Sequence, residues 1–321
     1  FAVHCDLQGG LNAAWGRDVA EEIIQNEPDF VIQMGDLSDP VYSTSWPTWE
    51  QFFTITTDEL QRAVFMPVCG NHDDGPSGNA DYWKIFSLPE KPSNGSCYSF
   101  DVGNTHFVAL NSDLEVEGQT NWLARDLQGA ANNTNIAWII PYFHRPPYSL
   151  GERAGDDHIK TNWCPVFVQY EADVVFSGHS HNYQRTVPIR GINYFVAGGG
   201  GGTLYYSTFT PGFHEYATTC LFFVSCHVSN LQMQVRGIRT DGLIFDQTVY
   251  TNIGRAVRVE PAFPVRGETV KIFYNAANGP LFYSSPVWLY LGVDAFGGAI
   301  INTAMTWNAG SGRWEHEFAV P

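Results

Sequence analysis

Residues 30–39 read FVIQMGDLSD, a mostly apolar run that ends abruptly in a glycine and two carboxylates. A short strand at 30–34 that leads straight into polar side chains is typical of α/β proteins, whose sites form at the carboxyl ends of parallel strands. Two neighbouring runs end in the same way: FAVHCD (1–6) and FMPVCGNHD (65–73). Helical patterns separate the three runs, which predicts a βαβαβ unit with right-handed crossovers.

The alternation of strands and helices continues to about residue 250. A hairpin is expected over 97–111, and further strands over 136–143 and 173–177, each preceded by a helix (near 122–127 and 166–170). From Thr186 onward the pattern is strand only, with turns at Arg190-Gly191 and Asp241-Gly242. The fold class that follows is α/β: a four-layer α/β/β/α sandwich of two packed sheets.

The character of the chain changes around residues 251–256. Closely spaced short strands punctuated by proline and glycine follow, as in a small all-β sandwich. We therefore expect an α/β domain over 1–252 and a β-sandwich domain over 253–321. The second domain is short for a sandwich, and its last strand, RWEHEFAVP (313–321), shows no closing partner, so we expect it to be truncated. Phe1 is not an initiator residue, and a leader or preceding segment is also expected to be missing.

Composition excludes several classes of protein. A nucleic-acid binder needs a basic face, whereas a chain with a formal net charge of −16 repels phosphate backbones outside any local cation site. The chain has no run of 18 or more apolar residues, so no membrane span is expected. The six cysteines include no CxxC pair, which argues against a thiolate zinc site and leaves disulfides and free thiols both open. Glycosylation sequons at Asn94 and Asn132, in an acidic and aromatic-rich chain, favour a secreted glycoprotein.

The polar clusters that follow the strands combine carboxylate, imidazole and amide groups without thiolate. A single aspartate at a strand end is more often a helix cap, but so many clusters in one domain favour a site for hard or borderline divalent ions. Two such ions bridged by one carboxylate can clamp a phosphoryl group. The clusters are Asp6-Leu7-Gln8, Gly35-Asp36-Leu37-Ser38-Asp39, Gly70-Asn71-His72-Asp73, His144, and Gly178-His179-Ser180-His181.

In this order the clusters resemble the calcineurin-like metallophosphoesterase superfamily over residues 1–250. YFHRPPYS (142–149) and GHSHNYQRTVP (178–188) are most similar to its purple acid phosphatase branch. The resemblance implies two metal ions of the Fe, Zn, Mn or Mg class. It implies the following ligands: Asp36 as the bridge, Asn71, His144 and His179 for one ion, and Asp6 and His181 for the other.

The resemblance also implies the chemistry. A metal-bound hydroxide would attack a phosphate monoester, with diesters as a further candidate class, and His72 beside Asp73 would protonate the leaving alkoxide or contact the transition state. The alternative is an extracellular structural or carbohydrate-associated protein that keeps this fold with a degraded first metal site. Two departures from the family pattern keep that alternative open: Gln8 replaces the usual glycine, and Asp39 stands where the purple branch has its iron-binding tyrosine. Gln8 and Asp39 are therefore further candidate ligands.

The tail carries aromatic residues that allow several interpretations. Residues 270–321, with Trp288, Tyr290, Trp307 and Trp314, resemble starch-binding modules over a short stretch. Core packing or an immunoglobulin-like spacer explains the same aromatics. The expected partners of 253–321 are a carbohydrate, a second subunit, or the first domain, on which it would dock.

The first prediction concerns colour. The purple branch absorbs visible light through charge transfer from tyrosinate to Fe(III), and Asp39 occupies the tyrosine position, so the metal-loaded protein is expected to be colourless. A visible absorption spectrum checks this. A band in the middle of the visible range that is lost on Tyr42→Phe would contradict it.

Overall fold

The computed structural model describes residues 1–7, 13–38, 46–73, 80–89, 97–114, 116–229 and 232–252, and, in the tail, 257–260, 269–274, 288–291, 301–308 and 313–319. The chain divides into two compact units. One spans 1–229 and 233–250, and the other spans 251–321 with 230–232. Each unit is described by itself.

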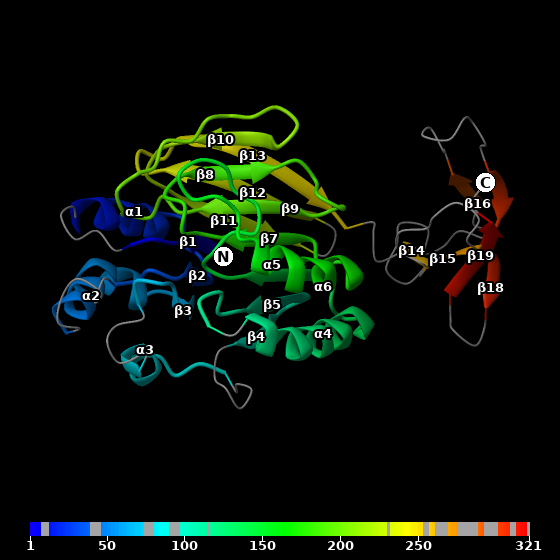
Figure 1. Cartoon of the computed structure of the whole chain (residues 1–321), viewed down its shortest axis with the longest axis horizontal. Helices are drawn as coiled ribbons and strands as arrows, with labels where there is room; N and C mark the ends of the chain where they lie inside the picture. The colour runs from blue at the N-terminus through cyan, green and yellow to red at the C-terminus, as the bar shows by residue number, and fades with distance from the viewer. Residues whose placement is uncertain are drawn as a thin grey trace. The chain divides into compact units, whose positions relative to one another are not determined.

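Two sheets form the first unit (Figure 1). The strands of the first sheet, in spatial order, are β13 (Ile244–Thr251), β12 (Gln232–Arg239), β11 (Phe222–Val228), β1 (Ala2–His4), β2 (Phe30–Met34) and β3 (Val64–Val68). Those of the second sheet are β10 (His214–Thr218), β8 (Tyr183–Thr186), β9 (Asn193–Ala197), β7 (Val174–Ser177), β6 (Trp138–Tyr142), β5 (Thr105–Ala109) and β4 (Tyr98–Val102).

Both sheets are mixed, with a parallel section inside each. Strands β1, β2 and β3 are parallel, as the βαβαβ pattern predicts, and so are β5, β6, β7 and β9. Other pairings in both sheets are antiparallel, for example β1 with β11 and β8 with β9. The parallel sections matter for function because the carboxyl ends of their strands lie along one edge of each sheet.

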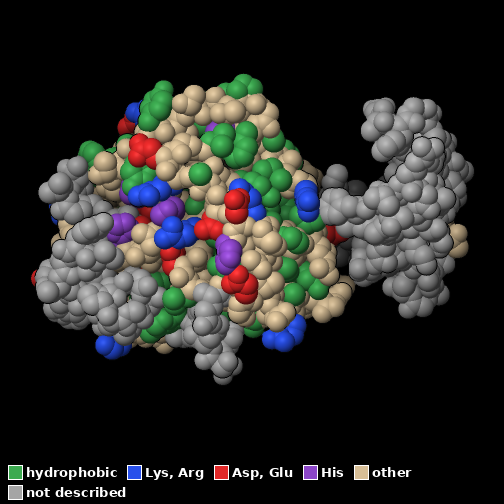
Figure 2. Space-filling view, in the orientation of Figure 1, with side chains coloured by type: hydrophobic (Ala, Val, Ile, Leu, Met, Phe, Trp, Pro, Cys, Tyr) green, Lys and Arg blue, Asp and Glu red, His purple; other side chains and the backbone are tan. Residues whose placement is uncertain are grey.

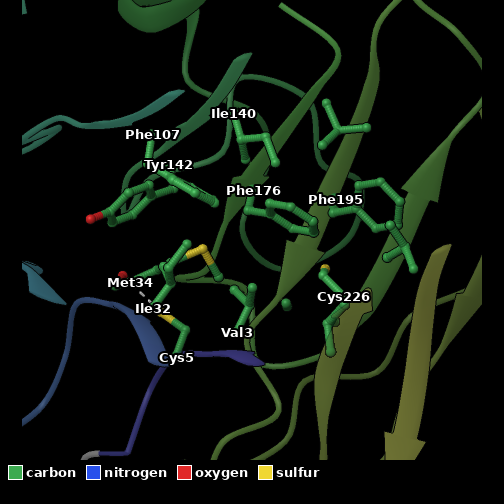
Figure 3. Close-up of a cluster of buried hydrophobic side chains, with 14 of the residues drawn as sticks. Val3, Cys5, Ile32, Met34, Phe107, Ile140, Tyr142, Phe176, Phe195 and Cys226 are labelled. Atoms are coloured by element: carbon green, nitrogen blue, oxygen red, sulfur yellow. Dashed lines mark hydrogen bonds between the residues drawn. The ribbon is translucent and has the colours of Figure 1, made fainter. Parts of the chain in front are cut away.

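A hydrophobic core lies between the two sheets (Figure 3). Side chains from β1 and β2, such as Val3 and Ile32, meet aromatic residues of the second sheet, such as Phe107, Phe176 and Phe195. All five side chains are almost fully buried. Face-to-face packing of this kind holds the two sheets together. The edges that carry the carboxyl ends of their parallel strands are held in place with them.

Helices cover the outer faces of the sheets. Helices α1 (Ala13–Gln25) and α2 (Trp46–Leu60) bury Val19, Ile23 and Phe52 against the first sheet. On the second sheet, α4 (Val116–Asn132), α5 (Asp157–Asn162) and α6 (Cys164–Gln169) bury Leu123 and Phe167 (Figure 1). The predicted α/β/β/α layering is confirmed.

Two short helices were not apparent from the sequence. One is α3 (Ala80–Ile85), and the other is α5, in a stretch that reads as a polar loop. The α5 helix is too short for a clear apolar periodicity, but Asp156 caps it by accepting bonds from the backbone N–H groups of His158 and Ile159. The six cysteines are thiols. In the described part of the chain, no helix has the length and apolarity needed to cross a bilayer.

The described strands of the second unit form two sheets. One has the order β14 (Val257–Glu260), β15 (Thr269–Tyr274), β19 (Arg313–Ala319), β18 (Thr306–Asn308), and the other pairs β16 (Trp288–Leu291) with β17 (Ile301–Ala304). The expectation that the last strand has no partner is wrong, because β19 is central and pairs with β15 and β18. The side chains of Trp288 and Tyr290 lie outside the described residues, so the β-sandwich and docking predictions stay predictions.

His106 on β5 provides a test of the second sheet. Its Nδ1 lies 2.6 Å from Asp101 and its Nε2 2.9 Å from Asp126. Burial opposes the charged form, but the two carboxylates raise the pKa of His106 above its ordinary value. The resulting stabilisation is present below the unfolded-state pKa and is lost as the pH rises through the folded-state pKa.

We expect His106→Gln to lower the free energy of unfolding by about 1 kcal/mol at pH 5.5 and by much less at pH 9.

Thermal unfolding at both pH values measures this difference. His227→Gln, at an exposed position on β11, is the control and should change little at either pH. If His106→Gln lowers the stability of the folded protein equally at pH 5.5 and pH 9, the ion pair contributes nothing to that stability.

Candidate metal centre

The polar clusters expected at strand ends come together where the two sheets adjoin. Each follows a strand directly: Asp6 follows β1, Asp36 follows β2, Asn71 follows β3, His144 follows β6, and His179 and His181 follow β7. Among the described residues there are three ligand groups, each with all its candidate atoms within 4.8 Å of one another: Asp36 with His144 and His179, Asp6 with Asp36 and His181, and Cys5 with Asp6 and His144. The first two share Asp36, as a bridging carboxylate would.

The first group surrounds the Nε2 atom of His144. This nitrogen lies 3.3 Å from Asp36 Oδ2, 3.1 Å from Asn71 Oδ1 and 3.2 Å from His179 Nδ1. The other ring nitrogen, Nδ1, lies 2.9 Å from the carbonyl oxygen of Met34. A hydrogen bond from Nδ1 to that carbonyl leaves the Nε2 lone pair directed at the cluster, an arrangement typical of a metal-ligating histidine.

The second group surrounds Asp6. Its Oδ1 is buried and accepts no hydrogen bond within the described part of the chain, and His181 Nε2 is 3.4 Å away. Its Oδ2 accepts a bond from the backbone N–H of His179. An unsatisfied buried carboxylate oxygen is costly, and a bound cation removes that cost. Both donor sets, carboxylate with imidazole and amide, fit a pair of hard or borderline divalent ions.

Three of these residues adopt a backbone conformation that non-glycine residues rarely use. Asp6, Asp36 and His179 have φ angles of 62°, 53° and 65°. Such strain persists only where the surroundings impose it, and it clusters at functional sites. Here it turns each side chain sharply away from the line of its strand and toward the neighbouring clusters.

Glycines give the ligands room. A Cβ atom on Gly70 would lie 2.3 Å from both the backbone N and the Oδ1 of Asp36. One on Gly198 would lie 2.7 Å from Asp6 Oδ2, and one on Gly202 2.8 Å from the ring of His181. The five-glycine run at 198–202 therefore lets the backbone approach the site closely.

The charges within the site are strongly coupled. Burial disfavours a charged Asp36, but His144 and His72 outweigh it and hold its pKa well below the ordinary value. Burial also disfavours a charged His144, yet Asp36 raises the pKa of His144 to about 10. In contrast, burial together with the charges of His144 and Arg145 lowers the pKa of His179 to about 2. Without metal, a protonated His144 thus offsets the negative charge of Asp36, and His179 is neutral.

His72 and Asp73, expected as catalytic residues, are placed differently. The half-buried His72 ring lies 4.0 Å from Asp36, at the exposed side of the cluster. The carboxylate of Asp73 is buried and accepts bonds from the backbone N–H groups of Leu37, Ser38 and Gly70. Asp73 therefore ties the loop after β2 to the loop after β3, and we interpret it as a positioning residue.

Cys5 is the thiol in the third ligand group. Its Sγ donates to the carbonyl oxygen of Met34 at 2.9 Å. Burial, followed by the charges of Asp6 and Asp36, raises the pKa of this thiol well above its ordinary value. A thiol that keeps its proton is a poor ligand, since metals bind the thiolate.

Some predicted residues fall outside the described part of the chain, and some contacts were missed. Gln8, Asp39, Tyr42 and Asn94 belong to segments that the structure does not describe. The residues missed are Arg145, which contacts His179, and Tyr205, which stacks on His181. Arg145 had a signal in the sequence, because it directly follows His144 in an acidic chain, whereas nothing local marks Tyr205.

Comparison with known proteins agrees with this geometry. Residues 6–183, more than half of the chain, match the calcineurin-like phosphoesterase family. The chain belongs to this family. Within the calcineurin-like phosphoesterases it is similar to purple acid phosphatases: it is 26% identical to purple acid phosphatase 23 of Arabidopsis thaliana over 203 residues, which cover 51% of this chain and 43% of that protein.

Two further similarities extend the comparison. An uncharacterized protein of Mycobacterium tuberculosis is 30% identical over 168 residues, which cover 45% of this chain and 32% of that protein. The purple acid phosphatase PPD1 from yellow lupin seeds has a similar fold, with a TM-score of 0.68, 18% identity, and coverage of 78% of this chain and 53% of that one. The sequence matches thus span less than half the length of these curated relatives.

Gly70 allows a test of the site geometry. We expect Gly70→Ala to push Asp36 aside, weakening metal binding about 10-fold or more and costing about 1–3 kcal/mol of stability. Gly129→Ala is the matched control: a Cβ there meets nothing within 4 Å, and alanine is the better helix former in α4. Metal titration and thermal unfolding measure both effects. Unchanged metal affinity in Gly70→Ala would contradict the geometry described.

Proposed function

We propose that this calcineurin-like phosphoesterase is a secreted dimetal phosphatase that hydrolyses phosphate monoesters. The observation that carries the proposal is the convergence of Asp6, Asp36, Asn71, His144, His179 and His181 on one place, with Asp36 common to two ligand groups. A pair of ions bound there would lower the pKa of water and neutralise charge on a phosphoryl group.

The residues of this chain would act on the substrate in distinct ways. Asp36 would hold both ions, since it belongs to two of the ligand groups. His72, half-buried beside Asp36, would donate a proton to the leaving oxygen of the ester. Asp73 would keep His72 in place, because its bond from Gly70 N–H anchors the start of the loop that carries His72.

Burial of the ligands supports catalysis as well as binding. The side chains of Asp6, Asp36 and His144 are at most 1% exposed. Charges in such a water-poor place act strongly on a substrate that enters it, and they need little reorganisation as the reaction proceeds. The buried parts of this site thus fit electrostatic stabilisation of a phosphoryl transition state.

Asn71 and His144 provide the test. We expect Asn71→Ala and His144→Ala each to lower the hydrolysis of p-nitrophenyl phosphate at least 100-fold, on the order expected for loss of a metal ligand. Circular dichroism should show an intact fold, because both residues lie in loops beyond the strand ends. Asn71→Ala should disturb the packing less than His144→Ala, because Asn71 is only half-buried.

Metal analysis of the same proteins distinguishes the proposal from its alternative. Two equivalents of metal in the wild type favour the enzyme, and none or one favours a structural protein with a degraded site. His227→Ala is the control and should retain full activity. Retention of most activity in either ligand variant would overturn the proposed ligand set.

Secretion is supported by the position of one sequon. Asn132 is exposed at the end of α4, where a glycan would meet no packed surface of its own helix. Expression through a secretory pathway is expected to yield a protein whose electrophoretic mobility rises on treatment with a glycosidase. Asn132→Gln should reduce that shift, and the absence of any shift in the wild type would count against a glycoprotein.

A further inference from the structure

Two arginines flank the metal centre of a strongly acidic chain. Arg145 follows His144 directly at the end of β6, and its side chain is 31% exposed. Arg153 is exposed in the segment between β6 and α5. Figure 2 shows basic side chains beside histidines and carboxylates on one face of the first unit. With only 17 Lys and Arg against 33 Asp and Glu, a pair of cations at this place needs an explanation.

Arg145 is held in a fixed orientation. Its Nε donates to Asp113 Oδ1 at 2.6 Å, and its backbone N–H donates to Ser112 Oγ at 2.8 Å. The Asp113 side chain is only 8% exposed, so this anchor is firm. The outer nitrogen, Nη1, lies 3.2 Å from His179 Nε2. One edge of the guanidinium is therefore committed to Asp113, and the other faces a candidate metal ligand.

Arg153 lies on the side of the other ion. Its guanidinium is 5.6 Å from the centroid of the Tyr205 ring, and that ring stacks on His181 with centroids 4.3 Å apart. The positive charges of Arg145 and Arg153 both lie close enough to His179 to act on it. Arg145 thus lies next to the candidate ligand His179, and Arg153 lies next to the ring that stacks on the candidate ligand His181.

The hydrogen atoms of His179 indicate what Arg145 does when the centre is loaded. The Nδ1 of His179 faces the cluster, 3.2 Å from His144 Nε2. When Nδ1 binds a cation, a neutral ring carries its proton on Nε2. Nε2–H and the Nη1–H of Arg145 are then two donors that face each other, and an anionic oxygen that accepts from both relieves this conflict.

We propose that Arg145 and Arg153 bind a second phosphate of the substrate, so that the preferred substrate is a diphosphate rather than a simple monoester. The inference rests on the proposed function, in which the ion pair holds the terminal phosphoryl group. The arginines lie outside the ligand set, and their forked donors match a phosphate that stays with the leaving group. The chain is negatively charged overall and repels phosphate, so these two arginines would supply the attraction for the second phosphate.

AMP and ADP form a matched substrate pair for the test, because they differ by one phosphate. With the full metal-loaded chain, we expect Arg145→Gln and Arg153→Gln each to lower the ratio of kcat/KM for ADP to that for AMP about 10-fold. Arg125→Gln, at an exposed position on α4, is the control and should leave the ratio unchanged. Equal losses on both substrates would place the arginines on the transferred phosphoryl group and overturn the proposal.

Binding gives a readout that does not depend on turnover. Calorimetric titration with the non-hydrolysable α,β-methylene analogue of ADP should show about 10-fold weaker affinity in each arginine variant, and no change in Arg125→Gln. Unchanged affinity would contradict the second-phosphate site. If the wild type hydrolyses neither the nucleotides nor p-nitrophenyl phosphate but binds the analogue through the arginines, the proposed phosphatase function fails while the anion site stands.

Discussion

Burial of the Asp6 and Asp36 carboxylates is the constraint on which this structure depends. Their side chains are 0% and 1% exposed, and an isolated buried carboxylate is costly. The surrounding residues offset part of that cost: the backbone N–H groups of His72 and His179 donate to Asp36 and Asp6, and the rings of His144 and His181 lie 3.3 and 3.4 Å from these carboxylates. Compensation within the described residues is incomplete, since Asp6 Oδ1 accepts no hydrogen bond. A pair of cations would complete the compensation of the two carboxylates. The fold and the proposed chemistry therefore both depend on the charges of Asp6 and Asp36.

The sheets explain why such an arrangement can be built. The apolar packing of residues such as Val3 and Phe176 holds two parallel sections against each other, and this brings loops from distant parts of the chain together. Strained φ angles at Asp6, Asp36 and His179 store unfavourable energy that this packing must offset. The stability of the interior therefore supports a site that would not form in an isolated loop.

The sequence predicted most of this arrangement, for a physical reason. Strands such as 30–34 are short, apolar and bounded by glycine, so both their type and the polar cluster at their end are local properties. Features that depend on distant contacts could not be predicted: the antiparallel strands beside β1, the central place of β19, and the carboxylate of Asp73, which accepts bonds from loop amides rather than facing a substrate. Helix α5 was missed because six residues are too few to show a period.

The central claim is that two cations share Asp36. Anomalous X-ray scattering from crystals of the full chain grown with Mn²⁺ tests it most directly. Two anomalous peaks are expected, both at a coordination distance of about 2 Å from the Asp36 carboxylate, with His144 and His179 next to one and His181 next to the other. A single peak, or two peaks of which neither contacts Asp36, would contradict it.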